Sequence, residues 1–157
     1  MIRAAVPADA ALAAGLALRL WPGHTEEELT AEMAELISSS EAVIFLAFKE
    51  CRAVGFAQVQ LRRDYVEGTT SSPVGYLEGI YVEETYRRRG IASRLTAAGE
   101  QWSAEQGCRE FASSCEADNL LSARFHRGAG FQDAGCIQCF VKSLNSFIRL
   151  DISASPR

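Results

Sequence analysis

The segment from Gly79 to Ser93 places the strongest constraint on how this chain folds. An apolar run, Gly79-Ile80-Tyr81-Val82, leads through an arginine-rich turn into Gly90-Ile91-Ala92-Ser93. The apolar run predicts a buried strand, and apolar residues at helical spacing from Ile91 to Trp102 predict a long helix. The first backbone N–H groups of a helix lack partners within it, and the aligned peptide dipoles place partial positive charge there. The segment therefore predicts a strand, a turn and a helix whose start binds an anion such as a pyrophosphate.

The composition of the turn also favours a bound anion. Arg87, Arg88 and Arg89 stand directly before Gly90, although cations are disfavoured at a helix N-terminus unless an anion is bound there. Gly90 and Ala92 are small, so a phosphate can approach the backbone closely. We expect the main chain from Gly90 to Ser93 to bind the phosphates, with Arg87, Arg88 and Arg89 adding charge at the rim. The alternative is a solvated basic patch without a ligand.

The residues before this segment predict two helices and then a group of strands. A helix is expected from Asp9, as its cap, to about Leu20, and it ends at Trp21-Pro22-Gly23 because proline and glycine break a helix. Thr25 and Glu28 have the spacing of a capping box, which predicts the start of a second helix. Runs of β-branched and aromatic residues predict strands at residues 42–48, 53–62 and 74–82.

The residues after the segment predict alternating strands and helices. The long helix is expected to end near Gln106, followed by a short extended stretch at residues 110–113 and a helix at residues 119–127. Further strands are expected from Phe131, one of them containing Cys136 to Val141. The predicted fold class is therefore α/β (α+β), with a mixed sheet flanked by helices.

Length and charge narrow the class of protein. The chain has 157 residues, 48% of them hydrophobic, which suits one soluble globular domain at residues 1–143. The net charge of −4 disfavours a nucleic-acid partner, and no apolar run reaches the ~18 residues of a membrane span. The start lacks the pattern of a secretory signal, so a cytoplasmic protein is expected. The five cysteines are expected to be reduced structural thiols, because Cys136 and Cys139 lack a second ligand pair for a metal.

Two motifs together resemble the GNAT superfamily of N-acetyltransferases. Arg87-x-x-Gly90-x-Ala92 is similar to the superfamily's pyrophosphate signature, and the stretch from Asn119 through His126 to Gly130-Phe131 is similar to its second conserved segment. The resemblance covers residues 2–142. It implies the GNAT fold, with a mostly antiparallel sheet, and acetyl-CoA as co-substrate without a metal. It also implies that the backbone of Ile80, Tyr81 and Val82 and the side chain of Asn119 contact acetyl-CoA.

Dispersed loop residues resemble a narrower group, the aminoglycoside 6'-N-acetyltransferases. The similar pieces are Trp21-Pro22-Gly23-His24, Asp64-Tyr65-Val66, Ser71-Ser72-Pro73-Val74 and Leu77-Glu78-Gly79-Ile80. The resemblance implies that Trp21, Tyr65 and Glu78 border an aminoglycoside, although Trp21 and Tyr65 could instead be core residues. Ser114 stands where the family commonly has an aspartate, and Gly135 where it has a glutamate. We place Ser114 in the substrate site, with less negative charge than in relatives.

Two side chains are candidates for proton transfer. Glu78 begins the strand that is expected to hold acetyl-CoA, so its carboxylate can attract a protonated amine and then accept its proton. It could equally be a solvated or salt-bridged strand residue. His126 occupies the position of a superfamily tyrosine that protonates the leaving thiolate, and imidazole can donate a proton near neutral pH. A structural histidine is the alternative.

The leading hypothesis for function is acetylation of the 6'-amine of aminoglycoside antibiotics, which confers resistance. The alternatives are acetylation of another amine, such as a polyamine or a protein lysine, and a non-catalytic acetyl-CoA sensor. The partner expected under these hypotheses is a small polycationic amine, a protein lysine or the coenzyme alone. Neither a nucleic acid nor a membrane is expected as a partner. Residues 144–157 form a C-terminal extension with a strand-like pattern and an expected disordered tail. The resemblance implies a homodimer formed through C-terminal strands.

Overall fold

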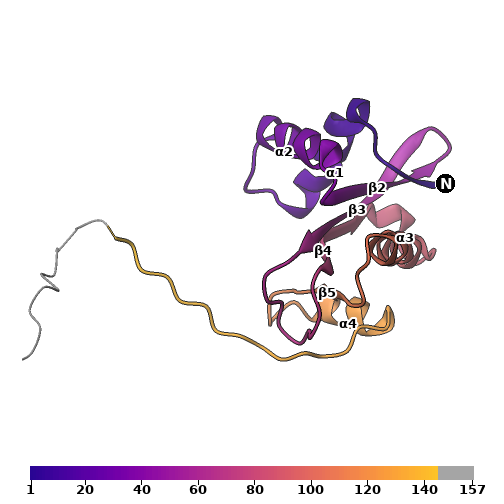
Figure 1. Ribbon diagram of the computed structural model, residues 1–157. Helices are drawn as coiled ribbons and strands as arrows, with labels where there is room; N and C mark the ends of the chain where they lie inside the picture. The colour runs from indigo at the N-terminus through magenta and orange to yellow at the C-terminus, as the bar shows by residue number, and fades with distance from the viewer. Residues whose placement is uncertain (145–157) are drawn as a thin grey trace, which may run out of the picture.

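The computed structural model describes residues 1–144, so the predicted strand and tail beyond Leu144 lie outside the described residues. Strands and helices follow one another along the chain in nearly the predicted order (Figure 1). The elements are β1 (Ile2–Ala4), η1 (Pro7–Asp9), α1 (Ala10–Leu20), α2 (Glu26–Ser38), β2 (Ala42–Lys49), β3 (Arg52–Arg62), β4 (Val74–Val82), η2 (Glu84–Tyr86), α3 (Ile91–Glu105), β5 (Phe111–Ser113) and α4 (Leu120–Gly128).

The five strands form one sheet in the order β1-β2-β3-β4-β5. Neighbours from β1 to β4 are antiparallel, and β5 joins the edge of β4 in parallel. Helices α1 and α2 cover one face of the sheet and α3 covers the other (Figure 1). This arrangement confirms the predicted α/β class with a mixed, mostly antiparallel sheet.

Each face of the sheet has its own apolar core. On the α1–α2 face, Phe56, Leu29 and Met33 are at most 1% exposed and pack with the alanines of α1. On the α3 face, Leu77 packs with Leu95 and the β3 side chains. Burying each such large side chain contributes about 1.5–3 kcal/mol. The two cores fix β3 and β4 between the helical layers, and these strands carry the candidate site.

The two predicted helix starts differ in how they are capped. The side chain of Thr25 accepts from the N–H of Glu28, and Glu28 accepts from the N–H of Thr25, which confirms the capping box of α2. Asp9 precedes α1 but its side chain caps no helical N–H. It instead accepts from the N–H of Val6 and pairs with Arg3 at 2.6 Å. The predicted cap is therefore wrong, because a guanidinium was the stronger partner.

The predicted strand at Cys136–Val141 is also wrong. From Phe131 to Leu144 the chain has no strand or helix and leaves the body as an extended arm (Figure 1). A strand needs a partner edge for its backbone hydrogen bonds, and the arm meets none among the described residues. Cys136 and Cys139 are free and exposed, as are Cys51 and Cys115, so only Cys108 is partly buried. The expectation of structural thiols fails for the four exposed cysteines.

Candidate active site

An open backbone edge on β4 lies at the centre of the candidate site. The parallel ladder to β5 joins only Gly75, Tyr76 and Leu77, so β4 continues to Val82 without a partner on that side among residues 1–144. On its other side the N–H of Glu83 donates to Val54 of β3. Because successive residues of a strand alternate in direction, the N–H groups of Ile80 and Val82 point to the open edge. They are free to bind an extended ligand.

The start of α3 lies directly beyond this edge. Its N-cap is Gly90, with φ of 72°, and no side chain caps the first turn. The N–H groups of Ile91, Ala92 and Ser93 therefore lack the side-chain acceptor that a Ser or Asp cap would supply. A Cβ on Gly90 would meet nothing within 4 Å, so the space over the turn is open. This geometry suits an anion on the backbone of residues 90–93.

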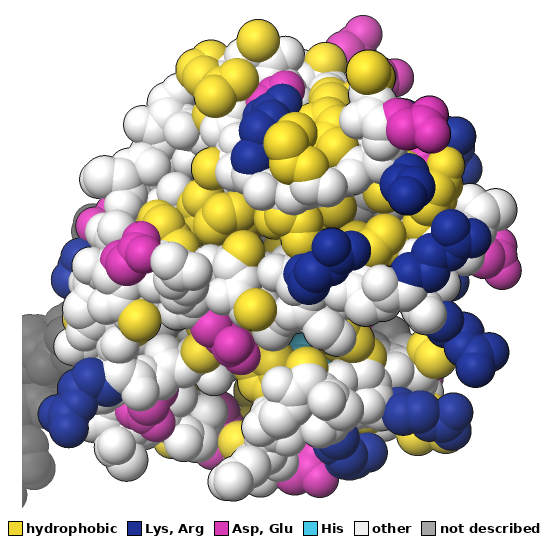
Figure 2. Space-filling view, turned by 90° about the vertical axis from the view of Figure 1, so that its right-hand side faces the viewer, with side chains coloured by type: hydrophobic (Ala, Val, Ile, Leu, Met, Phe, Trp, Pro, Cys, Tyr) yellow, Lys and Arg dark blue, Asp and Glu magenta, His cyan; other side chains and the backbone are white. Residues whose placement is uncertain are grey.

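The three arginines of the turn have different environments. Arg87 folds back and donates from Nε to the carbonyl of Val82 at 2.9 Å. Arg88 is exposed and holds a φ of 60°, and Arg89 lies over the ring of Tyr86. Figure 2, viewed from the right-hand side of Figure 1, shows several Lys and Arg side chains gathered on this face. Arg88 and Arg89 are thus placed to add charge at the rim. Arg87 departs from the expected rim role, because its Nε–H is used by the Val82 carbonyl at the end of β4.

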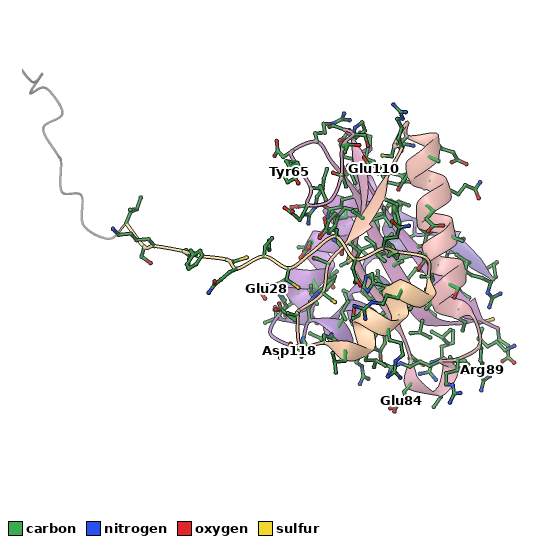
Figure 3. The ribbon with its side chains drawn as sticks, turned by 90° about the horizontal axis from the view of Figure 1, so that it is seen from below. Glu28, Tyr65, Glu84, Arg89, Glu110 and Asp118 are labelled. Atoms are coloured by element: carbon green, nitrogen blue, oxygen red, sulfur yellow. The ribbon has the colours of Figure 1, made fainter. Side chains whose placement is uncertain are left out.

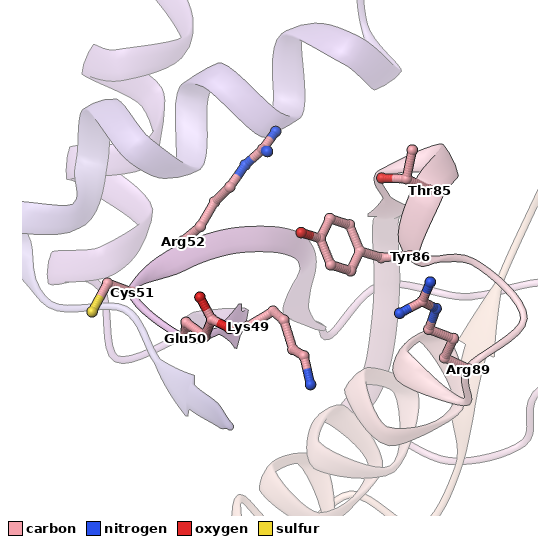
Figure 4. Close-up of a pocket in the computed structure, with 7 residues that line it drawn as sticks. All are labelled: Lys49, Glu50, Cys51, Arg52, Thr85, Tyr86 and Arg89. Atoms are coloured by element: carbon pink, nitrogen blue, oxygen red, sulfur yellow. The ribbon is translucent and has the colours of Figure 1, made fainter.

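A crevice of about 630 Å³ opens on the other side of the turn (Figure 4). The β2–β3 hairpin, including Lys49 and Arg52, forms one wall, and η2 with Tyr86 and Arg89 forms the other. Arg52 pairs with Glu83 at 2.8 Å. The crevice lies on the β3 side of β4, away from the gap between β4 and β5. Of the predicted site residues only Arg89 reaches it.

A β-bulge places Glu78 on the α1–α2 face of the sheet. Gln58 of β3 pairs with Gly79 whereas Val59 pairs with Leu77, so Glu78 is an extra residue in β4. Leu77 packs into the core beneath α3, and the α1–α2 face lies above Gly79. Such an insertion re-aims side chains and often occurs beside active sites. Without it, the alternation of β4 would not bring Glu78 and Gly79 to the same face.

The carboxylate of Glu78 is held by Arg62. The guanidinium donates from Nε at 3.0 Å and from a terminal nitrogen at 2.8 Å, one bond to each oxygen. Arg62 lies 3.5 Å over the ring of Tyr76, and the Tyr76 hydroxyl bonds the hydroxyl of Ser114 at 2.7 Å. The ion pair raises the pKa of Arg62. An ionised carboxylate has about four lone-pair positions, so Glu78 keeps roughly two for a ligand.

Trp21 forms the wall beside Glu78. Its ring packs edge-on against Phe56, with the ring centres 6.0 Å apart. A Cβ on Gly79 would lie 2.6 Å from two atoms of the indole, so the ring covers that glycine. Trp21 remains partly exposed. It is therefore a core residue that also lies beside Gly79 and the Glu78 bulge, and Ser114 is linked to the same face through Tyr76.

Tyr65 lies apart from this group, on the loop between β3 and β4. It is 75% exposed and lies at the same end of the molecule as Glu110, opposite Glu84 and Arg89 (Figure 3). The neighbouring Val66 is buried and packs with Val74 and Tyr76. The loop is therefore anchored to the sheet while Tyr65 projects outward.

Glu110, which the sequence did not mark as a site residue, fastens this loop. One carboxylate oxygen accepts from the N–H groups of Thr70 and Ser71, each at 2.8 Å, and from the Ser71 hydroxyl. These bonds lower the pKa of Glu110, with the Ser71 hydroxyl as the first cause. The carboxylate thus joins the loop to the residue before β5.

We expect acidification to loosen this loop. Because the pKa of Glu110 is depressed in the folded protein, its contribution is present above the ordinary glutamate value near 4.3 and fades as the pH falls below it. Hydrogen exchange at the Thr70 and Ser71 amides should therefore accelerate at low pH beyond the intrinsic rate. Glu110→Ala, which removes the acceptor oxygen, should show fast exchange already at pH 7. Equal protection in the variant and the wild type would contradict this role.

His126 connects α4, β5 and β4. Its Nδ1 lies 2.7 Å from the carbonyl of Ser122, which can only accept, so Nδ1 carries a hydrogen. Its Nε2 lies 2.8 Å from the Ser113 hydroxyl, which lies 3.0 Å from the carbonyl of Leu77. In the neutral ring Nε2 has no hydrogen to give. Only the protonated ring could therefore act as the predicted acid, and sequence reasoning missed Ser113 as its partner.

Asn119 is first of all the cap of α4. Its side-chain oxygen accepts from the N–H of Ser122 at 3.0 Å. The amide nitrogen is the end that remains to donate to a ligand.

Comparison with known proteins identifies the family. The sequence model of the Acetyltransferase (GNAT) family matches residues 14–131. Aminoglycoside N(6')-acetyltransferase type 1 of Serratia marcescens is 45% identical over 136 residues, covering 85% of this chain and 93% of its own. The protein of the same name from Salmonella typhimurium is 40% identical over 119 residues, covering 76% and 82%. This chain belongs to the GNAT acetyltransferase family.

A solved GNAT structure extends this agreement to the fold. AAC(6')-Iy in complex with the bisubstrate analogue CoA-S-monomethyl-acetylneamine superimposes with a TM-score of 0.88 at 36% identity, covering 91% of this chain and 97% of its own. The predicted resemblance to the GNAT superfamily and to the aminoglycoside 6'-N-acetyltransferases is confirmed. In this GNAT chain, residues 1–144 include no cluster of three or more His, Cys, Asp or Glu that could hold a metal. None of the described helices is long and apolar enough to cross a membrane.

Proposed function

We propose that this protein transfers the acetyl group of acetyl-CoA to the 6'-amine of aminoglycoside antibiotics and so confers resistance. The observation that carries the proposal is the open edge of β4. The first turn of α3, which no side chain caps, lies at one end of this edge, and Glu78 lies at the other. A pyrophosphate on residues 90–93 and a pantetheine arm along Ile80, Tyr81 and Val82 would direct the thioester toward Glu78. The Asn119 amide would donate to the arm.

The chemistry follows from this placement. The ammonium of the substrate binds Glu78, which accepts its proton directly or through water. The neutral amine attacks the thioester carbonyl carbon, and an N–H of β4, from Ile80 or Val82, stabilises the oxyanion. The C–S bond then breaks and the attacking nitrogen loses its second proton to water, leaving the neutral acetylated amine and a thiolate. The protonated ring of His126 gives the thiolate its proton. Trp21, Tyr65 and Ser114 would border the amino sugar.

A thiol-release assay across amines tests the proposal. We expect rapid release with kanamycin or tobramycin, which carry a 6'-amine, and slow release with aminoglycosides that have a 6'-hydroxyl instead. Spermidine and a lysine peptide should have much lower kcat/KM. A higher kcat/KM for either of these would favour the alternative substrates. Tight acetyl-CoA binding without thiol release to any amine would favour a sensor.

Gly90→Ala should weaken acetyl-CoA binding. A φ of 72° costs a residue with a side chain roughly 1–2 kcal/mol, and relaxation of that strain would turn the first-turn amides away from the phosphates. We expect the acetyl-CoA Kd, measured by calorimetry, to rise about tenfold, which is roughly 1.4 kcal/mol.

Gly107→Ala is the matched control for this variant. Gly107 follows the other end of α3, has a φ of 88° and also has open space at its Cβ position. The two variants should lose similar stability, but only Gly90→Ala should lose acetyl-CoA affinity. Equal Kd values in the two variants would argue against phosphate binding at Gly90.

We further propose that the protein acts as a homodimer in the cytoplasm, where acetyl-CoA is available. The extended arm after Phe131 exposes apolar side chains that a second copy could cover: Ile137 70%, Phe140 86%, Val141 98% and Leu144 74% exposed. Light scattering should give twice the 17.1 kDa mass of the chain. A monomer at micromolar concentration would reject the dimer.

A further inference from the structure

Within residues 1–144, one buried side-chain oxygen has no hydrogen-bond partner. It is Oε1 of Gln58, a residue that is 4% exposed. Leaving a buried amide oxygen without a donor costs about 1–3 kcal/mol. Native proteins rarely keep such a group without a reason. Gln58 therefore calls for an explanation beyond packing.

The strand register places Gln58 on the α1–α2 face of the sheet. Phe56 packs beneath α1, whereas Ala57 and Val59 pack beneath α3. Since side chains alternate along β3, Gln58 points to the same face as Phe56. Its partner on β4 is Gly79, the residue that follows the bulge at Glu78.

Gln58 consequently lies between the two walls of the candidate substrate site. On one side, Trp21 packs on Phe56 and covers Gly79. On the other side is the ion pair of Glu78 with Arg62, which stands farther along the same face of β3. A substrate that reaches Glu78 beside Trp21 would come to the edge of Gln58.

We propose that Gln58 is a substrate-binding residue: its amide turns toward the site when substrate binds, and its Oε1 then accepts a hydrogen bond from an ammonium or hydroxyl group of the amino sugar that is acetylated. This inference rests on the proposed function and adds a residue to its substrate site. Glu78 attracts any cation by its charge, whereas a neutral acceptor beside it favours ligands that place an N–H or O–H group at that point. A site built to bond an N–H or O–H group discriminates strongly against ligands that lack it, because the protein group is then left unpaired.

Gln58→Met tests the proposal because the protein should become more stable while its affinity for the substrate falls. Methionine fills a similar volume without a buried polar atom, so the Tm of the unliganded protein should rise by about 2–4 °C. The KM for neamine, a two-ring substrate with a 6'-amine, should rise about tenfold. The kcat and the KM for acetyl-CoA should stay within about twofold. Gln58→Glu keeps an oxygen acceptor, so its neamine KM should stay near or below that of the wild type.

The matched control is Gln60→Met, two residues along the same face and partly exposed, which should leave both KM values unchanged. An unchanged neamine KM in Gln58→Met overturns the inference, as does a rise in the KM of both substrates. A lower Tm with unchanged KM would show that the amide is satisfied within the fold. Failure of the wild type to acetylate neamine would instead reject the proposed function, and the inference with it.

Discussion

Glu78→Gln should lower kcat/KM for an aminoglycoside by roughly 100- to 1000-fold. The change removes the charge that binds the ammonium, and a hydrogen bond between charged groups is worth about 1.5–3 kcal/mol. It also leaves the Arg62 guanidinium, which now makes two bonds to Glu78, as an uncompensated cation beside the amine. Together these effects amount to about 3–4 kcal/mol, at 1.36 kcal/mol per tenfold change in rate. Steady-state kinetics at saturating acetyl-CoA would measure the loss.

Glu41→Gln supplies the control. Glu41 makes the same kind of two-bond pair with Arg63, the residue that follows Arg62. The nitrogen–oxygen distances are 3.0 and 3.1 Å. That pair is more exposed, at 61% for Arg63 and 51% for Glu41, and exposed pairs contribute about 0–1 kcal/mol. Glu41→Gln should therefore leave kcat/KM unchanged. Acetyl-CoA affinity should survive in both variants, and full turnover by Glu78→Gln would remove this carboxylate from the mechanism.

Gly79→Ala should damage both stability and activity. The added Cβ would lie 2.6 Å from the ring of Trp21 and 2.9 Å from a methyl group of Leu20. Because the indole is also packed on Phe56, it cannot move without opening the core. Overpacking of this kind costs about 1–3 kcal/mol. We expect a lower denaturant midpoint and, if Trp21 borders the amino sugar as proposed, a KM for the aminoglycoside raised about tenfold or more.

Gly23→Ala separates this steric effect from the general effect of replacing a glycine. Gly23 lies in the turn after Trp21, where a Cβ would meet nothing within 4 Å, so little change is expected. Trp21→Leu in the Gly79→Ala background should restore part of the lost stability, because a smaller side chain relieves the overlap. Failure to restore any stability would show that the damage has another cause.

The local elements of the fold could be predicted from the sequence because their signals are local. The apolar runs at residues 42–48 and 74–82, the Thr25–Glu28 capping box and the glycine turn before Ile91 are confirmed at the expected positions. The arm after Phe131 could not be predicted in this way. Its alternating residues match a strand, but a strand forms only where another strand offers an edge, and no local pattern records that edge.

The candidate site could be predicted in part. Trp21, Glu78 and Ser114 are far apart in sequence, and the structure connects them through Gly79, Arg62 and Tyr76. Tyr65 is not brought into contact with them. The bulge at Glu78, the unpaired amide of Gln58 and the bond between Ser113 and His126 depend on register across strands. Only the glycine after Glu78 gave a hint of the bulge, because glycine within a strand often marks one.

Because Trp21 lies over Gly79, its intrinsic fluorescence can report on ligand binding near Glu78. The chain has two tryptophans, and the other, Trp102, packs with the core beneath α3. In a Trp102→Phe background, the emission spectrum would come from one indole beside Glu78. Antibiotic titrations could then be followed without a label, separately from events at the far end of the coenzyme.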